Sequence, residues 1–264
     1  MHSILKTIIL CLFLILFLPS LTSGKEASNI TYDKKKVRDR YVDLVYINLN
    51  SPKIKVTPAL TAGFSDAKKK YPLQSFTKFV EYYKPTAAIN GTYFDTHTHK
   101  PVGTIVIERE LVNNGSTGIA VCIDKDNQVT FHHLSGKLGS NIDWSPFESV
   151  ICSGPSLITE GEVELNPRGE GFKDPAVYNS NRRSAIGLTP YNKLLFVTVK
   201  SKVTLKKLSF IMKDLGCIYA VNLDGGTSSA LYYRGTHITK TSRKMSNVIL
   251  VYEDRNKIKV KGFK

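Results

Sequence analysis

Short apolar or alternating stretches, separated by turn residues, run through most of the chain and predict strands. They cover residues 41–49, 53–57, 118–123, 128–131, 184–188, 194–199 and 248–252. Turn-forming tetrapeptides at residues 124–127 and 189–192 predict two hairpins. Links this short favour a largely antiparallel sheet over alternating strand–helix–strand units.

Two stretches place apolar residues at helical spacing. The first stripe consists of Leu73, Phe76, Val80 and Tyr83, and the second of Leu205, Leu208, Met212 and Leu215. Thr204 is the expected N-cap of the second helix. A short apolar strand follows each helix and ends in an asparagine, Asn90 or Asn222, 17 positions after the first leucine of its stripe. The equal spacing indicates either an internal repeat, which would bring both strand ends to one site, or a coincidence.

These elements predict an α+β fold, in which a curved, mostly antiparallel sheet packs against the two helices. The chain has 264 residues, and no Gly/Ser linker or low-complexity segment divides it. We therefore expect a single domain over residues 41–264, preceded by a basic, mobile segment over residues 25–40.

The first 24 residues have the pattern of a secretory signal peptide. One lysine, Lys6, precedes an almost purely apolar run at 7–18, and small polar residues at 19–24 predict cleavage near Ser23 or Gly24. The expected location is therefore secreted, periplasmic or on the cell surface. The apolar run is shorter than the ~20 residues that span a bilayer. An uncleaved signal anchor is the alternative, and it is the only membrane contact that the sequence suggests.

Composition narrows the class of protein. Hydrophobic residues make up 42% and charged residues 22%, which is typical of a globular chain and not of a disordered one. The formal net charge of +15 favours an anionic partner. No motif of stacking aromatics supports nucleic acid as that partner. Outside the leader, Cys122, Cys152 and Cys217 have apolar neighbours and are expected as small core residues, although export would permit one disulfide.

The densest cluster of polar chemistry is the stretch NLDGGTSS at residues 222–229. An apolar strand here delivers a carboxylate, Asp224, directly into two glycines. Adjacent glycines let backbone amides approach a ligand, and amides with hydroxyls can bind phosphate oxygens. A plain hairpin turn is the competing interpretation. The candidate phosphate-binding residues are Gly225, Gly226, Thr227 and Ser228.

Two further stretches carry candidate chemistry. In INGTYFD, residues 89–95, Asn90 and Asp95 could orient a sugar or a water molecule. At the start of a predicted strand, Arg183 could grip an anionic oxygen pair with its planar guanidinium. The competing interpretations are a turn and a solvated basic edge.

A metal site is a third option. Asp95 with His97 and His99 would place three metal-type side chains on one strand face, although a polar loop explains the same pattern. The motifs require no cofactor. A Ca²⁺ or Mg²⁺ ion bound by carboxylates near Asp224 is an alternative that the sequence leaves open. Walker, HExxH and GxSxG motifs are absent from the sequence, which argues against those enzyme classes.

Taken in order, six stretches resemble the phosphodiester glycosidase family. They are INGTYFD (89–95), GTIVIEREL (103–111), GPSLI (154–158), RSAIG (183–187), NLDGGTSSALYY (222–233) and RKMSNVILV (243–251). Each motif is short, but their order and spacing cover most of the chain after the leader. The chain is similar to family members that consist of the bare catalytic domain.

The resemblance implies hydrolysis of a sugar-1-phosphate diester at the anomeric C–O bond, with release of a sugar and a phosphomonoester. Asp224 would then act as base or nucleophile, with Asn90 and Asp95 orienting the sugar or the water. Arg183 and the glycine turn would bind the phosphate, and Arg243 would add charge at the rim. A non-catalytic protein that binds anionic glycans is the alternative, followed by a metal-dependent hydrolase built on Asp95, His97 and His99.

Overall fold

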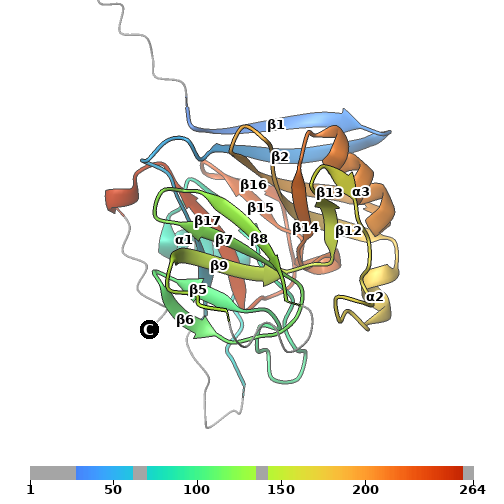
Figure 1. Ribbon diagram of the computed structural model, residues 1–264, viewed down its shortest axis with the longest axis horizontal. Helices are drawn as coiled ribbons and strands as arrows, with labels where there is room; N and C mark the ends of the chain where they lie inside the picture. Colours follow the sequence, from blue (N-terminus) through green and yellow to red (C-terminus); the bar gives the residue numbers. More distant parts are fainter. Residues whose placement is uncertain (1–27, 62–69, 135–141, 258–264) are drawn as a thin grey trace, which may run out of the picture.

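The computed structural model describes residues 28–61, 70–134 and 142–257 (Figure 1). The predicted signal peptide lies outside these residues. Within them, no helix is long and apolar enough to cross a membrane.

The largest sheet has seven strands, and every neighbouring pair in it is antiparallel. Its order is β1 (Ile30–Val37), β2 (Arg40–Asn48), β13 (Lys193–Val203), β12 (Asn181–Leu188), β14 (Tyr219–Asn222), β10 (Ser156–Thr159) and β11 (Glu162–Val163). Pairing of β12 with both β13 and β14 puts the start of β12 beside the end of β14.

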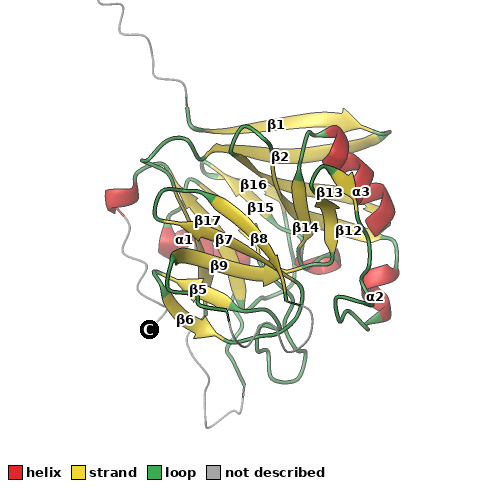
Figure 2. Cartoon of the chain, in the orientation of Figure 1, coloured by secondary structure: helices red, strands yellow, loops and turns green. Residues whose placement is uncertain are grey.

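Two five-stranded antiparallel sheets pack next to it (Figure 2). The first has the order β16 (Thr236–Thr239), β15 (Leu231–Tyr233), β4 (Ala87–Asn90), β17 (Asn247–Tyr252) and β3 (Lys55–Leu60). The second has the order β6 (Glu110–Asn113), β5 (Ile105–Ile107), β9 (Phe147–Ser153), β7 (Ile119–Asp124) and β8 (Val129–His133).

The two predicted main helices are present and capped. Ser75 caps α1 (Phe76–Tyr83) by accepting from the Lys78 amide, and Thr204 caps α3 (Leu205–Asp214) by accepting from the Lys207 amide. Leu73 precedes α1, where it packs as a partly buried residue against the same core. A short helix, α2 (Pro175–Tyr178), was not predicted and lies beside the start of β12 (Figure 1).

Among the residues that the structure describes, four apolar clusters hold these layers together. The largest fills the space between the seven-stranded sheet and the two smaller sheets, where Phe196, Ile89 and Ile151 meet. The opposite face of the large sheet is covered by α3, and α1 covers the outer face of the β4 sheet. Each main helix therefore shields the sheet that contains the strand following it in sequence.

The α+β class and its antiparallel pairing are confirmed, as are both predicted hairpins. The single curved sheet is instead three sheets, because the strands after the hairpins pair with partners far along the chain. The mobile segment is wrong over residues 30–37, which form β1 in continuous register with β2. Ile30 is buried and Tyr32 half-buried there, whereas the lysines face solvent at the sheet edge, so charge alone misrepresented this segment.

All three cysteines outside the leader are buried free thiols, as expected for small core residues. Burial raises the pKa of Cys152 and of Cys217 to about 12, so both stay protonated and unreactive at neutral pH.

Candidate active site

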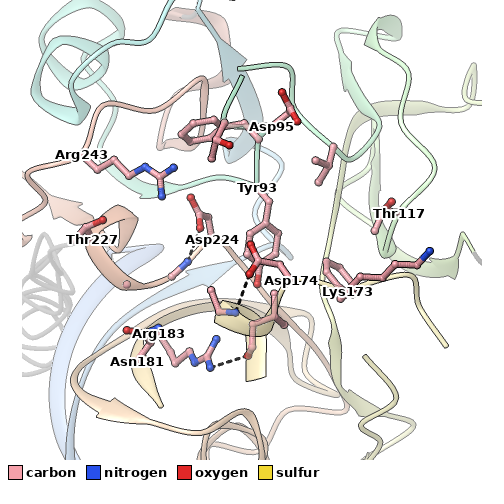
Figure 3. A pocket seen from close by; sticks show the side chains of 18 of the residues that line it. Tyr93, Asp95, Thr117, Lys173, Asp174, Asn181, Arg183, Asp224, Thr227 and Arg243 are labelled. Carbon is pink, nitrogen blue, oxygen red and sulfur yellow. Dashed lines mark hydrogen bonds between the residues drawn. The ribbon is translucent and has the colours of Figure 1, made fainter. Parts of the chain in front are cut away.

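One cavity of about 570 Å³ opens where strand ends from two sheets meet the α2 segment (Figure 3). It contains most of the predicted site residues, which come from four separate parts of the sequence. Those that line it are Asp95, Arg183, Asp224, Gly225, Gly226, Thr227 and Arg243. Asn90 and Ser228 do not line it and are buried behind its wall.

Asp224 projects into the cavity just beyond the end of β14. One carboxylate oxygen accepts a hydrogen bond from the Gly225 amide at 2.9 Å, which fixes the side chain in place. Burial raises the pKa of Asp224 to about 6, against the opposing effects of the Ser228 hydroxyl, Arg243 and the Gly225 amide. A carboxylate whose pKa is raised toward 7 can accept a proton during a reaction near neutral pH.

Asn90 supports Asp224 from behind. Its Nδ2 donates to the Asp224 carbonyl at 2.7 Å, and its Oδ1 accepts from the Ala230 amide at 3.0 Å. The Asp224 amide in turn donates to the Gly91 carbonyl at 3.2 Å. These bonds join the ends of β4 and β14, so the two strand ends do meet at one site, which is one of the two alternatives that the equal spacing left open. Asn90 thus bridges backbone groups, where we had expected it to face a sugar or water.

The glycine turn is a short 3₁₀ segment, Gly226–Ser228. Gly226 has φ of +61°, a left-handed conformation that side chains disfavour, whereas Gly225 has ordinary extended geometry. The amides of Ser228 and Gly225 are already bonded, to the Gly225 carbonyl and the Asp224 carboxylate. In the described part of the chain, the amides of Gly226 and Thr227 have no such acceptor, and both residues line the cavity.

Arg183 is 2% exposed and is the largest fully buried side chain among the described residues. Backbone carbonyls hold its guanidinium: Nη2 donates to Val177 at 2.9 Å and to Asn179 at 2.5 Å, and Nε donates to Val203 at 3.3 Å. No carboxylate of the described residues forms an ion pair with it. Burial lowers its pKa, and the remaining nitrogen, Nη1, lies beside Gly225 at the cavity.

Arg243 and Asp95 stand at the rim. The Arg243 guanidinium lies over the Phe94 ring, 4.8 Å from its centroid, and faces the cavity (Figure 3). Asp95 is exposed, and its Oδ1 accepts from the amides of His97 and Thr98 and from the Thr98 hydroxyl. These bonds lower the pKa of Asp95, so it stays a carboxylate.

The described residues do not form the alternative three-ligand metal site of Asp95, His97 and His99. The Asp95 carboxylate accepts hydrogen bonds from the His97 and Thr98 amides of its own loop, and His99 Nδ1 lies 2.9 Å from the Tyr71 carbonyl oxygen. Across residues 28–61, 70–134 and 142–257, no group of three or more His, Cys, Asp or Glu side chains is arranged to hold a metal ion.

The cavity also contains residues that the sequence analysis did not assign to the site. They are Tyr93, Phe94, Thr96, Val102, Thr117, Gly171, Phe172, Lys173, Asp174, Ala176, Val177 and Asn181. Tyr93 lies inside the INGTYFD motif and could have been included on that ground. The segment from 171 to 177 has no motif, and the dipeptide Asp174–Pro175 was its one usable signal, as a helix start.

Comparison with solved structures shows the same fold in distant proteins. A hypothetical protein from Synechocystis is 16% identical with a TM-score of 0.71, over 84% of this chain and 62% of that one. The zebrafish N-acetylglucosamine-1-phosphodiester alpha-N-acetylglucosaminidase catalytic domain, auto-inhibited by its pro-peptide, is 23% identical with a TM-score of 0.63, over 85% and 82%. A putative exported protein from Burkholderia pseudomallei K96243 is 12% identical with a TM-score of 0.62, over 81% and 74%. The chain thus spans less than two thirds of the Synechocystis protein.

No curated protein matches the sequence. The sequence model of the phosphodiester glycosidase family does match it, over residues 83–252. This range contains the six motifs, Asp224, Arg183 and the whole lining of the cavity. The chain therefore belongs to the phosphodiester glycosidase family.

Proposed function

We propose that this protein is an exported hydrolase that cleaves a sugar-1-phosphate diester at the anomeric C–O bond. The products are a free sugar and a phosphomonoester. Membership of the family supports the reaction class, and the apolar leader at 7–18 supports export. The basic composition suits a phosphate-containing glycan as substrate.

One observation carries the proposal: Arg183 is buried without a carboxylate partner, and it opens onto the same cavity as Asp224. A buried guanidinium is costly unless a negative charge is supplied to it. Three backbone carbonyls fix its orientation but bring no full charge. A phosphate bound in the cavity would supply that charge.

The remaining groups suit the two parts of such a substrate. The free amides of Gly226 and Thr227, with Arg183 and Arg243, form a cationic, N–H-rich end for the phosphate. Tyr93, Phe172 and Val102 form a more apolar end for a sugar ring. Figure 3 shows Asp224 beside Tyr93 and between the two arginines, and the anomeric carbon would be placed next to its carboxylate.

In the reaction, a water oxygen bonds to the anomeric carbon as the C–O bond to phosphate breaks. The electron pair of that bond stays on the oxygen that leaves with phosphorus, and Asp224 takes the proton from water. The phosphate passes from one negative charge toward two, and a phosphomonoester has a second pKa of about 6, so it leaves without a proton at neutral pH. If Asp224 instead attacks the anomeric carbon and displaces the phosphate, a covalent glycosyl ester forms; water then attacks the same carbon, gives its proton to the solvent or to the released phosphate dianion, and frees the Asp224 carboxylate. The two successive inversions leave the sugar with its original anomeric configuration.

A panel of sugar-1-phosphodiesters, assayed for released reducing sugar, tests the proposal. We expect turnover in the wild type and about 10²–10⁴-fold less in Asp224→Asn. Proton NMR of the first-formed anomer tells base from nucleophile. Saturable binding without product after prolonged incubation would instead identify a protein that only binds anionic glycans. Unchanged turnover in His97→Ala under strong chelation would remove the metal-dependent alternative.

A further inference from the structure

Tyr93 holds a hydroxyl whose direction is set by a neighbouring amide. Its oxygen accepts a hydrogen bond from Asn222 Nδ2 at 2.5 Å. The same nitrogen donates to the Leu223 carbonyl at 2.7 Å and approaches the Gly154 carbonyl at 3.3 Å. Two carbonyl neighbours identify this atom as the nitrogen, because an amide oxygen would be repelled there. The phenol is therefore an acceptor toward Asn222, and its own O–H points elsewhere.

No acceptor for that O–H occurs among the described residues, and Tyr93 lines the cavity. The ring is held against Phe172, with 5.7 Å between centroids. The hydroxyl interacts electrostatically with both Asp224 and Arg183, and Figure 3 shows the side chain pointing into the cavity beside Asp224. Burial raises the pKa of Tyr93, so the phenol keeps its proton at neutral pH.

We infer that the Tyr93 hydroxyl donates a hydrogen bond to the oxygen that leaves with phosphorus, an assignment that rests on the proposed function. In the proposed complex Asp224 acts at the anomeric carbon and Arg183 binds the phosphate. The bridging oxygen, which joins carbon to phosphorus, therefore lies between these two side chains, where the Tyr93 hydroxyl can reach it. Negative charge grows on it as the C–O bond breaks, so a fixed neutral donor stabilises the transition state more than the ground state. The proton stays on the phenol, which is a far weaker acid than the phosphomonoester.

Tyr93→Phe removes this donor and keeps the ring. Loss of one such donor costs about 10²–10³ in kcat, and we expect that loss with little change in KM. Two substrates with the same sugar and aglycone, one with a bridging oxygen and one with a bridging sulfur, sharpen the test. Sulfur accepts hydrogen bonds weakly, so the loss should fall to roughly fivefold or less on the sulfur-linked substrate.

Tyr233→Phe is the matched control. The Tyr233 hydroxyl also accepts from a side-chain N–H, that of Arg234, but its proton already has an acceptor in the Ile30 carbonyl at 2.9 Å. It does not line the cavity. We expect wild-type kcat on both substrates, with any change confined to the unfolding midpoint.

The outcomes separate the two hypotheses. A Tyr93→Phe enzyme within about threefold of wild type, or one impaired equally on both substrates, overturns the assignment of Tyr93 alone. A wild type that releases sugar from neither substrate overturns the proposed function and this assignment with it. A selective loss on the oxygen-linked substrate supports both.

Discussion

The side-chain amide of Asn90 donates to the backbone carbonyl of Asp224 across 2.7 Å and thereby joins two sheets. Asn90 ends β4 in one sheet, and Asp224 follows β14 in another. Each of these strands follows a helix that covers its own sheet. The candidate catalytic carboxylate is thus held in place by a contact that exists only once both sheets are packed together.

Asn90→Ala should lower both stability and turnover. It leaves the Asp224 carbonyl and the Ala230 amide unpaired in a buried place, which costs about 1–3 kcal/mol, and it frees the turn that carries Asp224. Urea unfolding and kcat measure the two effects. Asn127→Ala is the control, because Asn127 is also buried and donates to the Ser51 and Ile54 carbonyls, away from the cavity. It should lose stability only; equal losses of kcat in both variants would contradict the role of Asn90.

Turnover should depend on the ionisation of Asp224. With a pKa of about 6, the carboxylate is protonated in acid, so kcat/KM should fall as pH drops through about 6. Asp224→Asn should reduce turnover by about 10²–10⁴ and remove this acidic limb from any residual activity. Near-normal turnover in the variant would rule out proton transfer by Asp224.

The same substitution should stabilise the fold at neutral pH. An aspartate has a pKa near 3.8 when unfolded, so between pH 4 and 6 the folded protein binds more protons and stability falls as pH rises. Asp224→Asn removes this cost, which amounts to about 1–3 kcal/mol above pH 6. Urea unfolding at pH 4 and pH 8 should show a gain only at pH 8. A loss at both values would mean that the carboxylate stabilises the fold.

Arg183 should matter for charged substrates. Arg183→Lys keeps a positive charge but cannot reproduce the three carbonyl contacts, so its charge should be misplaced. We expect kcat/KM to fall at least about 100-fold on a sugar phosphodiester and much less on an uncharged aryl glycoside. Arg182→Lys is the neighbouring control, because Arg182 contacts the Ser229 and Lys240 carbonyls outside the lining. An equal loss on both substrates would make Arg183 a purely structural residue.

Glu170 should make the cavity wall sensitive to pH. Its two carboxylate oxygens share the Ser156 amide at 2.9 and 3.1 Å, which ties down the segment leading into Phe172 and Asp174. Burial and the charge of Glu164 raise the pKa of Glu170 to about 7, so stability falls as pH rises from about 4.5 to 7.

Glu170→Gln should flatten this fall and gain about 1–3 kcal/mol over wild type at pH 8, with no gain at pH 4. Urea unfolding at the two pH values measures it, with the exposed Glu110→Gln as control. A variant that loses stability at pH 8 would show that the ionised carboxylate is the better partner for the Ser156 amide.

The sequence was sufficient for the local features. Helical spacing located α1 and α3, turn residues located the hairpins, and the family motifs pointed to Asp224, Arg183 and the glycine turn. Asn90 and Ser228 were expected to contact the substrate and instead lie buried behind the cavity wall, because a motif does not tell which side of a turn faces a cavity. The sequence also missed Phe172, Lys173 and Asp174, whose segment has no motif and reaches the cavity through tertiary contacts alone.

The sequence by itself determined the two main helices, the hairpins, many of the strands and the family motifs, since these depend on neighbours within a few positions of one another. The tertiary structure decided which polar groups are satisfied by the chain and which are left for a ligand. The Asn90 amide donates its hydrogen bond to the Asp224 carbonyl, whereas Arg183 and the Tyr93 hydroxyl face the cavity, where a ligand can bind them. The difference arises because the partners of a buried polar group come from strands distant in sequence, and packing of the sheets selects them.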